Sequence, residues 1–205
     1  MSWLGFSWPE PVRVQSQHIA EYDAVITHLR TRGLLYRCFK TRKELPPGLY
    51  RGQSLGVDEE QSRIVGGQSF SWRLSVTRCQ DVITEVLRYE DTGIDPGVKT
   101  VNLDALGDAI LTRKDIGTSY HVACCHDDAL QNITHIVRGA DIAPLTPFHR
   151  VLQHLMNWPV PIYHHHALLK NASGEKLSKR KRAASIDSLI AEGFTAAQVL
   201  DMATP

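Results

Sequence analysis

The first regular pattern of apolar residues predicts a helix near the start of the chain. Apolar side chains recur at spacings of three and four, at Ile19, Tyr22, Ile26 and Leu29. This spacing places them on one face of an amphipathic helix. Ser16 suits the N-cap, and Gly33 is a typical stop after the last turn. We therefore expect a helix within residues 1–35.

The pattern is weaker over residues 36–106. Proline and glycine interrupt it at positions 46–48, at 66–67 and within 91–97, between short strand-like pieces. Ser71–Val76 is one of these pieces. We predict an irregular insertion that contains short strands.

Strand-like and helix-like patterns alternate again over residues 107–170. The run Tyr120–Cys125 predicts a buried strand, and Ile133–Val137 predicts a second strand. Thr146 is predicted to cap a helix that has Pro147 in its first turn. The apolar stripe of that helix would consist of Val151, Leu152, Leu155 and Met156. The alternation predicts an α/β layer.

Two short helices are predicted within residues 171–205. Ser185 suits the N-cap of the first helix, which Gly193 would stop. Thr195 and Gln198 have the spacing of a capping box at the start of the second helix.

The composition is that of a globular protein. The chain has 205 residues, of which 42% are hydrophobic, enough for one substantial core with or without a smaller subdomain. No stretch approaches the roughly 18 consecutive apolar residues of a membrane span, so we expect a soluble, cytoplasmic protein without membrane contact. The formal net charge of +1 argues against binding through a global positive field. It leaves Lys176–Arg182 as a local basic patch.

Cysteines and histidines form no clear metal motif. The four cysteines, Cys38, Cys79, Cys124 and Cys125, have no CxxC spacing, and reduced thiols are expected. The three consecutive histidines at 164–166 would alternate between the faces of a strand, so they could not all bind one ion. Structural packing is the better interpretation of this triplet, and no metal site is predicted.

Tyr120 and Arg138 are candidates for a binding site. With Tyr120 on one strand and Arg138 at the end of another, a phenol and a guanidinium could lie over one pocket at the carboxyl edge of the sheet, where open α/β folds bind ligands. A guanidinium fork suits a carboxylate, so a small acidic ligand such as an amino acid is a reasonable hypothesis. The alternative is a core tyrosine and a surface arginine.

The segment Lys-Leu-Ser-Lys-Arg, from Lys176 to Arg180, follows the turn-forming residues 171–174. Two lysines on a loop could close over a triphosphate and neutralise the charge that develops during attack at the α-phosphate. The alternative is a solvated basic loop.

Several blocks of the chain, in order, resemble the catalytic domain of class I glutamyl-tRNA synthetases. The blocks begin with "WLGFSW", "GDAILTRKDIGTSYHVACCHDD" and "TPFHRVLQHLMNW", and "KLSKR" resembles the KMSKS signature loop of that family. The resemblance implies an α/β fold: an incomplete class I Rossmann-like catalytic domain with a small strand-containing insertion and short C-terminal helices. Residues 1–35 would then give a helix of the first Rossmann half, 36–106 the insertion, 107–170 the second half, and 171–205 the signature loop with the last helices.

The same resemblance implies an ATP-dependent ligase that activates glutamate, with Mg²⁺ accompanying ATP. Tyr120 and Arg138 match the residues that contact glutamate. The residues implied to bind ATP are Lys176, Leu177, Ser178, Lys179 and Arg180, and Lys176 and Lys179 would be catalytic.

One branch of the family attaches glutamate to the queuosine base of tRNA(Asp) and has no anticodon-binding domain. The chain ends about 25 residues after the signature loop. This early end resembles the pattern of that branch. Glutamate and tRNA, with tRNA(Asp) favoured, are therefore the implied partners. The zinc-type region of this branch has two cysteines one residue apart, then a tyrosine and a further cysteine. Here Cys38 is followed by Lys40, and Tyr50 stands where the later cysteine is expected, so no zinc is predicted.

A second departure concerns the start of the chain. In the family, a half-domain with the His-Ile-Gly-His signature precedes the "WLG" block, and this chain begins at that block. Weak activity or none is therefore expected, together with marginal stability or self-association. The alternatives are a catalytically impaired fragment or pseudoenzyme that binds tRNA or another partner, and a start site placed about 60 residues too late.

Overall fold

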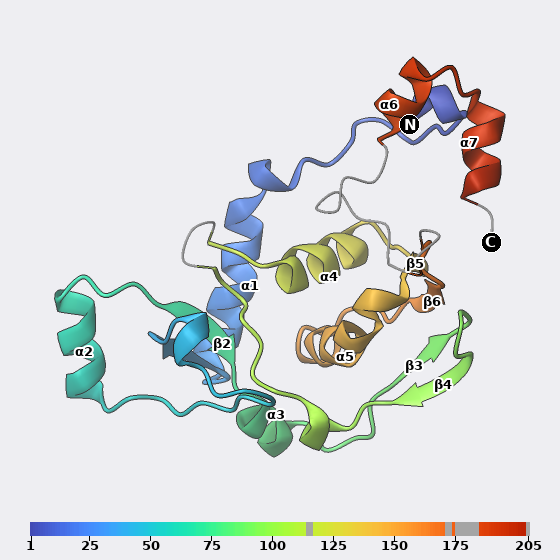
Figure 1. Ribbon diagram of the computed structural model, residues 1–205. Helices are drawn as coiled ribbons and strands as arrows, with labels where there is room; N and C mark the ends of the chain where they lie inside the picture. Colours follow the sequence, from blue (N-terminus) through green and yellow to red (C-terminus); the bar gives the residue numbers. More distant parts are fainter. Residues whose placement is uncertain (114–116, 171–173, 175–184, 204–205) are drawn as a thin grey trace.

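Helices and strands alternate along the chain in a computed structural model, which describes residues 1–113, 117–170, 174 and 185–203 (Figure 1). The described strands form two sheets, one of four strands and one of two. Three helices, α1 (Ile19–Thr31), α4 (Tyr120–Leu130) and α5 (Thr146–Leu155), lie together in the middle of the molecule. This is the expected α/β architecture.

The larger sheet has the strand order β4-β3-β6-β5. Its strands are β3 (Arg88–Asp91), β4 (Gly97–Thr100), β5 (His135–Gly139) and β6 (Ile162–His166). β3 and β4 form an antiparallel hairpin, whereas β6 is parallel to both β3 and β5. Helix α5 connects β5 to β6, as a parallel pair requires. The carboxyl ends of β3, β5 and β6 therefore meet at one edge of the sheet, where the candidate site lies.

The smaller sheet pairs β1 (Leu35–Cys38) with β2 (Ser71–Leu74) in antiparallel register. Helices α2 (Val57–Val65) and α3 (Val76–Val82) belong to the same part of the chain. Strand β2 confirms the strand predicted from Ser71, although it ends two residues earlier. Ser75 ends the strand because its hydroxyl accepts the backbone N–H of Arg78 and caps α3.

The hydrophobic core lies where α1, α4 and α5 pack against the sheets. Its fully buried side chains include Leu29, Leu74, Leu111, Val122 and Leu152. Burying one such side chain contributes about 1.5–3 kcal/mol, so this cluster carries much of the stability. The helix predicted from the apolar stripe that begins at Ile19 is confirmed, with His18 rather than Ser16 at its N-cap.

A buried carboxylate joins the segment before α1 to α4. Asp127 accepts hydrogen bonds from Arg13 Nε at 2.9 Å, Gln15 Nε2 at 3.0 Å and Tyr22 Oη at 2.9 Å. Burial alone would raise the pKa of Asp127, but these donors and His126 lower it below its usual value. Asp127 is therefore an anionic structural centre.

Two sequence predictions are wrong in this region. Tyr120–Cys125 forms the start of α4 and not a strand. A short apolar run has no period that separates a buried strand from a buried helix, and here it continues through Asp127 to Leu130 as a helix. The N-cap of α5 is Leu145, and the hydroxyl of Thr146 bonds to side chains of the site instead of capping the helix.

The other predictions for the second half of the chain are confirmed. β5 is the strand expected from Ile133, shifted by two residues. Ser185 caps α6 (Ile186–Ala191), and Thr195 caps α7 (Ala196–Met202) through a capping box. Figure 1 shows α6 and α7 beside the N-terminal end of the chain, where α7 contacts the 3₁₀ turn Ser2–Leu4.

Candidate active site

Arg138 lies at the carboxyl end of β5 and is only 9% exposed. Its Nε donates to His165 Nε2 at 3.1 Å, and one terminal nitrogen donates to His149 Nδ1 at 3.2 Å. The other terminal nitrogen donates to Thr146 Oγ1. The guanidinium carbon also lies 4.9 Å from the centre of the Tyr163 ring, which is a cation–π contact. Among the described residues, the side chains that accept these three hydrogen bonds are two imidazoles and a hydroxyl, none of which is negatively charged.

Asp91 sets the orientation of the His165 ring. The buried carboxylate at the end of β3 accepts from His165 Nδ1 and from the Gly93 backbone N–H. With the proton on Nδ1, Nε2 keeps its lone pair and can accept from Arg138 and from the Thr146 hydroxyl. Burial alone would raise the pKa of Asp91, but the bonds from Gly93 and His165 lower it below its usual value. The carboxylate thus stays ionised and holds Arg138 through His165.

Gly93 is required for this arrangement. A Cβ at this position would lie 2.2 Å from the backbone oxygen of His165, a distance that no side chain tolerates. The close approach lets Thr92 and Ile94 donate backbone hydrogen bonds to β6, at 2.8 and 2.9 Å. The turn after β3 therefore brings Asp91 beside His165.

Tyr120 stands next to Arg138, but it comes from the first turn of α4. Its side chain is 51% exposed, and its ring lies 5.7 Å from that of His149. Burial raises the pKa of the Tyr120 phenol, while the charge and hydrogen bonding of Arg138 oppose that rise. The structure thus brings the predicted pair together. The alternative, a core tyrosine and a surface arginine, is wrong, because Arg138 is buried and Tyr120 is exposed.

Two more histidines surround Arg138. Burial, assisted by the charge of Arg138, lowers the pKa of His149 to about 2 and that of His121 to about 4. Both rings are therefore neutral near pH 7. Among the described residues of this cluster, Arg138 therefore carries the positive charge.

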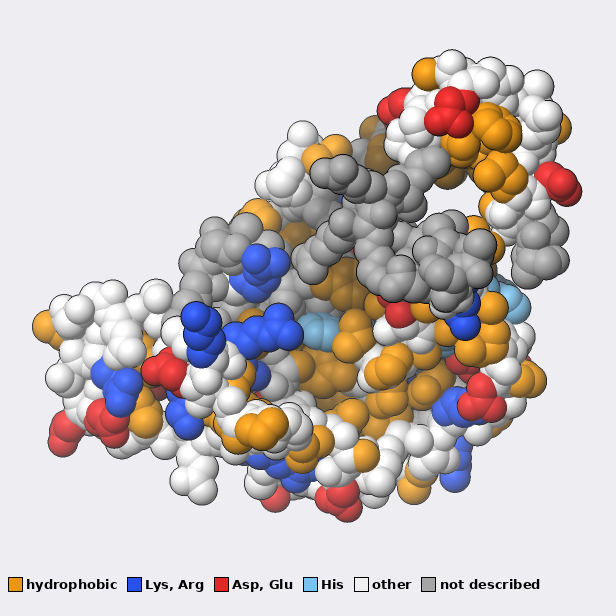
Figure 2. Space-filling model, in the orientation of Figure 1, with side chains coloured by type: hydrophobic (Ala, Val, Ile, Leu, Met, Phe, Trp, Pro, Cys, Tyr) orange, Lys and Arg blue, Asp and Glu red, His pale blue; other side chains and the backbone are white. Residues whose placement is uncertain are grey.

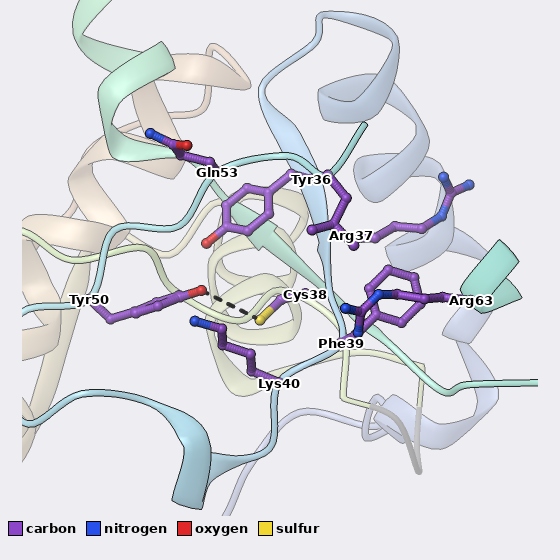
Figure 3. A pocket seen from close by; sticks show the side chains of 9 residues that line it. Tyr36, Arg37, Cys38, Phe39, Lys40, Tyr50, Gln53 and Arg63 are labelled. Atoms are coloured by element: carbon purple, nitrogen blue, oxygen red, sulfur yellow. Dashed lines mark hydrogen bonds between the residues drawn. The ribbon is translucent and has the colours of Figure 1, made fainter. Parts of the chain in front are cut away.

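The pocket around Cys38 contains the residues that resemble a degenerate zinc region (Figure 3). Cys38 Sγ lies 4.0 Å from Tyr50 Oη, and Lys40 Nζ lies 5.7 Å from the centre of the Tyr50 ring. The structure therefore brings these three residues together around a cavity of about 80 Å³. One thiol, one phenol and an ammonium group do not form a tetrahedral zinc site, so the described residues of this pocket do not fit zinc.

A hollow of about 480 Å³ lies beside His121. Its lining comes from Gly48–Tyr50, Ala105–Ala109, His121, Pro144, Leu145 and Phe148. Figure 2 shows one face of the molecule hollowed, with hydrophobic side chains and a histidine inside and Lys and Arg side chains along the edge.

The family model for class I tRNA synthetases (E and Q), catalytic domain, matches residues 1–203. The chain belongs to this family. Three relatives, all named glutamyl-Q tRNA(Asp) synthetase, are similar over nearly the whole chain. The protein of Rhodobacter capsulatus is 33% identical over 97% of this chain and 77% of its own length. The protein of Nocardia farcinica is 32% identical over 98% of this chain and 65% of its own length. That of Cupriavidus metallidurans is 37% identical over 90% of this chain and 60% of its own length.

The fold also matches a solved synthetase. The glutamate-tRNA synthetase of Elizabethkingia anophelis is 23% identical, with a TM-score of 0.69 over 94% of this chain and 42% of that protein. This similarity confirms the Rossmann-like class I fold. The chain spans 60–77% of the three relatives described above and less than half of the solved protein.

The family's signature loop falls outside the described residues. Lys176, Leu177, Ser178, Lys179 and Arg180, the predicted ATP-binding residues, all lie there. Strand β6 ends at His166, on the same sheet edge as Arg138. Their roles remain predictions. In the described part of the chain, no helix is long and apolar enough to cross a membrane.

Sequence reasoning missed Asp91, His149 and His165. The histidine triplet does alternate faces, with His165 buried and His164 and His166 exposed, as predicted. The buried His165 ring also accepts a hydrogen bond from Arg138. It belongs to the Arg138 cluster, which consists of Arg138, Asp91, Tyr120, Thr146, His149 and His165. No local pattern signals this, since Asp91 lies 74 positions away from His165 in the sequence.

Proposed function

We propose that this synthetase chain activates glutamate with ATP and transfers it to tRNA, with the queuosine base of tRNA(Asp) as acceptor. The observation that carries the proposal is the Arg138 cluster: a buried guanidinium, hydrogen-bonded to two imidazoles and a hydroxyl, lies at the edge where open α/β sheets bind ligands. The relatives' shared name supports the acceptor.

The chemistry assigns Arg138 to one carboxylate of glutamate. In the first step, an oxygen of the α-carboxylate attacks the α-phosphorus of ATP, the bond to the pyrophosphate oxygen breaks, and pyrophosphate leaves. The α-carboxylate must stay free for this attack, so Arg138 binds the side-chain carboxylate, and Tyr120 lines the same site. In the second step, a hydroxyl of the acceptor attacks the acyl carbon and AMP leaves.

Lys176 and Lys179 act on the phosphates in this proposal. Their charges neutralise the negative charge that develops as pyrophosphate leaves, with Mg²⁺ accompanying ATP. Removing one such charge costs about 10²–10³ in rate. No observation among the described residues favours the alternative of a protein that only binds tRNA.

Glutamate-dependent exchange between ATP and labelled pyrophosphate tests the first step. Wild-type protein should show exchange with glutamate and not with glutamine, because glutamine lacks the second carboxylate. Lys179→Ala should lower the exchange rate about 100-fold or more and leave glutamate binding unchanged. Exchange that does not depend on the amino acid would overturn the proposal.

Transfer of labelled glutamate tests the acceptor. Queuosine-containing tRNA(Asp) should be labelled, and the same tRNA made without queuosine should not. Labelling of tRNA(Glu) instead would contradict the proposed acceptor and indicate a glutamyl-tRNA synthetase activity.

A further inference from the structure

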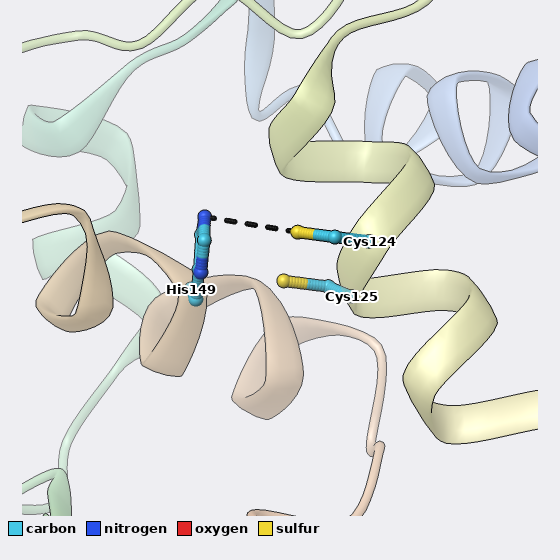
Figure 4. A group of neighbouring side chains, drawn as sticks. All are labelled: Cys124, Cys125 and His149. Atoms are coloured by element: carbon cyan, nitrogen blue, oxygen red, sulfur yellow. Dashed lines mark hydrogen bonds between the residues drawn. The ribbon is translucent and has the colours of Figure 1, made fainter. Parts of the chain in front are cut away.

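Four soft donor groups converge beside the candidate active site. Cys124 and Cys125 on α4 face His149 on α5, and one donor atom from each lies within 4.8 Å of the others (Figure 4). His121, one turn earlier on α4, places Nδ1 3.1 Å from His149 Nε2. In the described part of the chain, Cys124, Cys125 and His149 are the one group of three or more such residues with metal-binding spacing, and His121 lies beside it.

The spacing of these atoms is close to that of a tetrahedral metal site. With metal–sulfur bonds of about 2.3 Å and metal–nitrogen bonds of about 2.0–2.1 Å, neighbouring donors lie about 3.3–3.8 Å apart. His121 Nδ1 and His149 Nε2 are separated by 3.1 Å, and Cys124 Sγ and His149 Nε2 by 4.0 Å. Each of these two separations lies within about 0.5 Å of the tetrahedral value.

We propose that Cys124, Cys125, His121 and His149 bind a soft divalent metal ion of the zinc class. Two thiolates and two imidazoles are the donor set that Zn²⁺ and its probe Co²⁺ prefer, and two thiolates balance the charge of the ion. Buried thiols can also serve as small apolar side chains. Without an ion, the Nε2–H of His149 donates a hydrogen bond to His121 Nδ1, and a metal ion would replace that proton on His149.

The site has a route for the ion. Cys125 and His149 are buried, whereas Cys124 and His121 are half-buried. His121 lines the hollow of about 480 Å³, so the ion can enter from that side. The buried pair would then complete the coordination from the core.

Metal binding should change the contacts of Arg138. In the structure His149 Nδ1 accepts from Arg138, so the ring proton lies on Nε2. A metal ion on Nε2 moves that proton to Nδ1, where it faces the Arg138 donor. The bond between His149 and Arg138 is then lost, while the bonds to His165 and Thr146 remain. This consequence for glutamate affinity rests on the proposed function, whereas the metal site itself does not.

Titration of chelator-treated protein with Co²⁺ tests the site. Wild type should bind one equivalent, with a thiolate-to-cobalt charge-transfer band and the strong visible bands of tetrahedral Co²⁺, and Zn²⁺ should displace it. The Cys124→Ser/Cys125→Ser double variant should lose the charge-transfer band and at least about 100-fold in affinity, more than the loss expected from an outer partner.

Two further variants separate a lost ligand from a lost fold. Cys38→Ser is the matched control, because Cys38 is a buried thiol in the other pocket, and it should bind Co²⁺ as wild type does. His121→Gln changes a half-buried ligand and should weaken binding at least about 10-fold with an unchanged circular dichroism spectrum. Absence of a charge-transfer band in wild type, or its loss in Cys38→Ser alone, would overturn the proposal.

Glutamate affinity with and without Zn²⁺ gives a separate readout. If the metal site exists and Arg138 binds glutamate, Zn²⁺ should change the dissociation constant in wild type and not in the double variant. Cobalt binding without any glutamate binding would refute the proposed function and leave the metal site standing.

Discussion

Two arginines of this chain occupy opposite electrostatic settings. Arg13 is held by carboxylates, with Nε 2.9 Å from Asp127 and a terminal nitrogen 2.5 Å from Glu21. Arg138 is buried more deeply, yet within the described chain it donates to two imidazoles and a hydroxyl. Carboxylates of the fold therefore neutralise the charge of Arg13, whereas no described carboxylate is hydrogen-bonded to Arg138.

The difference has an energetic side. Burying a charge without a directly bonded counter-ion costs several kcal/mol unless other groups stabilise it. Here the Tyr163 ring and three neutral acceptors stabilise the guanidinium. Such an arrangement is less stable than a complete ion pair, and it gains stability when an anion binds. We infer that the buried charge of Arg138 lowers the stability of the unliganded protein and that a bound anion would raise it.

Arg138→Lys should have the largest effect on activity. Lysine keeps the charge but lacks the fork that bonds to three acceptors and a carboxylate at once. Glutamate-dependent pyrophosphate exchange should fall about 100-fold or more in kcat/KM, because truncating a buried charged contact costs about 2–5 kcal/mol. The matched variant Arg13→Lys should retain exchange within about threefold. Equal losses in both variants would break the distinction between the two arginines.

Asp127→Asn should have the largest effect on stability. It leaves Arg13 without its buried partner, and breaking a buried pair costs about 3–5 kcal/mol. Because Arg13 is partly exposed, we expect about 2–4 kcal/mol in urea unfolding. Glutamate affinity of the folded variant should stay within about twofold of wild type. A tenfold loss of affinity would show that the two centres are not independent.

Asp91→Asn tests how Arg138 is held. The amide oxygen would accept the Gly93 backbone N–H, as Asp91 Oδ1 does now, so the NH₂ group would face His165 Nδ1. The ring proton would then move to Nε2 and oppose the N–H of Arg138. We expect glutamate binding about 10-fold weaker, measured by calorimetry.

Asp95→Asn is the matched control for this change. Asp95 is an exposed carboxylate on the same hairpin, paired with Lys99. Its replacement should not alter glutamate affinity. If Asp91→Asn also binds glutamate normally, the Asp91–His165 contact serves stability alone.

The sequence predicted much of the fold but only half of the Arg138 cluster. Helices with their own period and caps, such as those at Ile19, Ser185 and Thr195, were found because their signals are local. Tyr120–Cys125 was misassigned because a short apolar run has no distinguishing period. Asp91 and His165 could not be paired, since a parallel sheet joins residues that no sequence spacing connects.

The smallest effect is expected for Asp128, whose pKa depends on the charges of both Arg138 and Asp127. Burial raises its pKa to about 6, the charge of Arg138 opposes this shift, and Asp127 adds to it. A carboxyl whose pKa rises on folding stabilises the fold most below its ordinary value of 3.8 and loses that contribution as the pH rises through about 6. Asp128→Asn should therefore leave stability unchanged below about pH 4 and raise it by about 1–2 kcal/mol above pH 6, measured by urea unfolding across that range.

Because the variant removes a negative charge near Arg138, glutamate should bind up to about twofold more tightly. Destabilisation at neutral pH would instead place Asp128 with Asp127, as a carboxylate that the fold requires in its charged form.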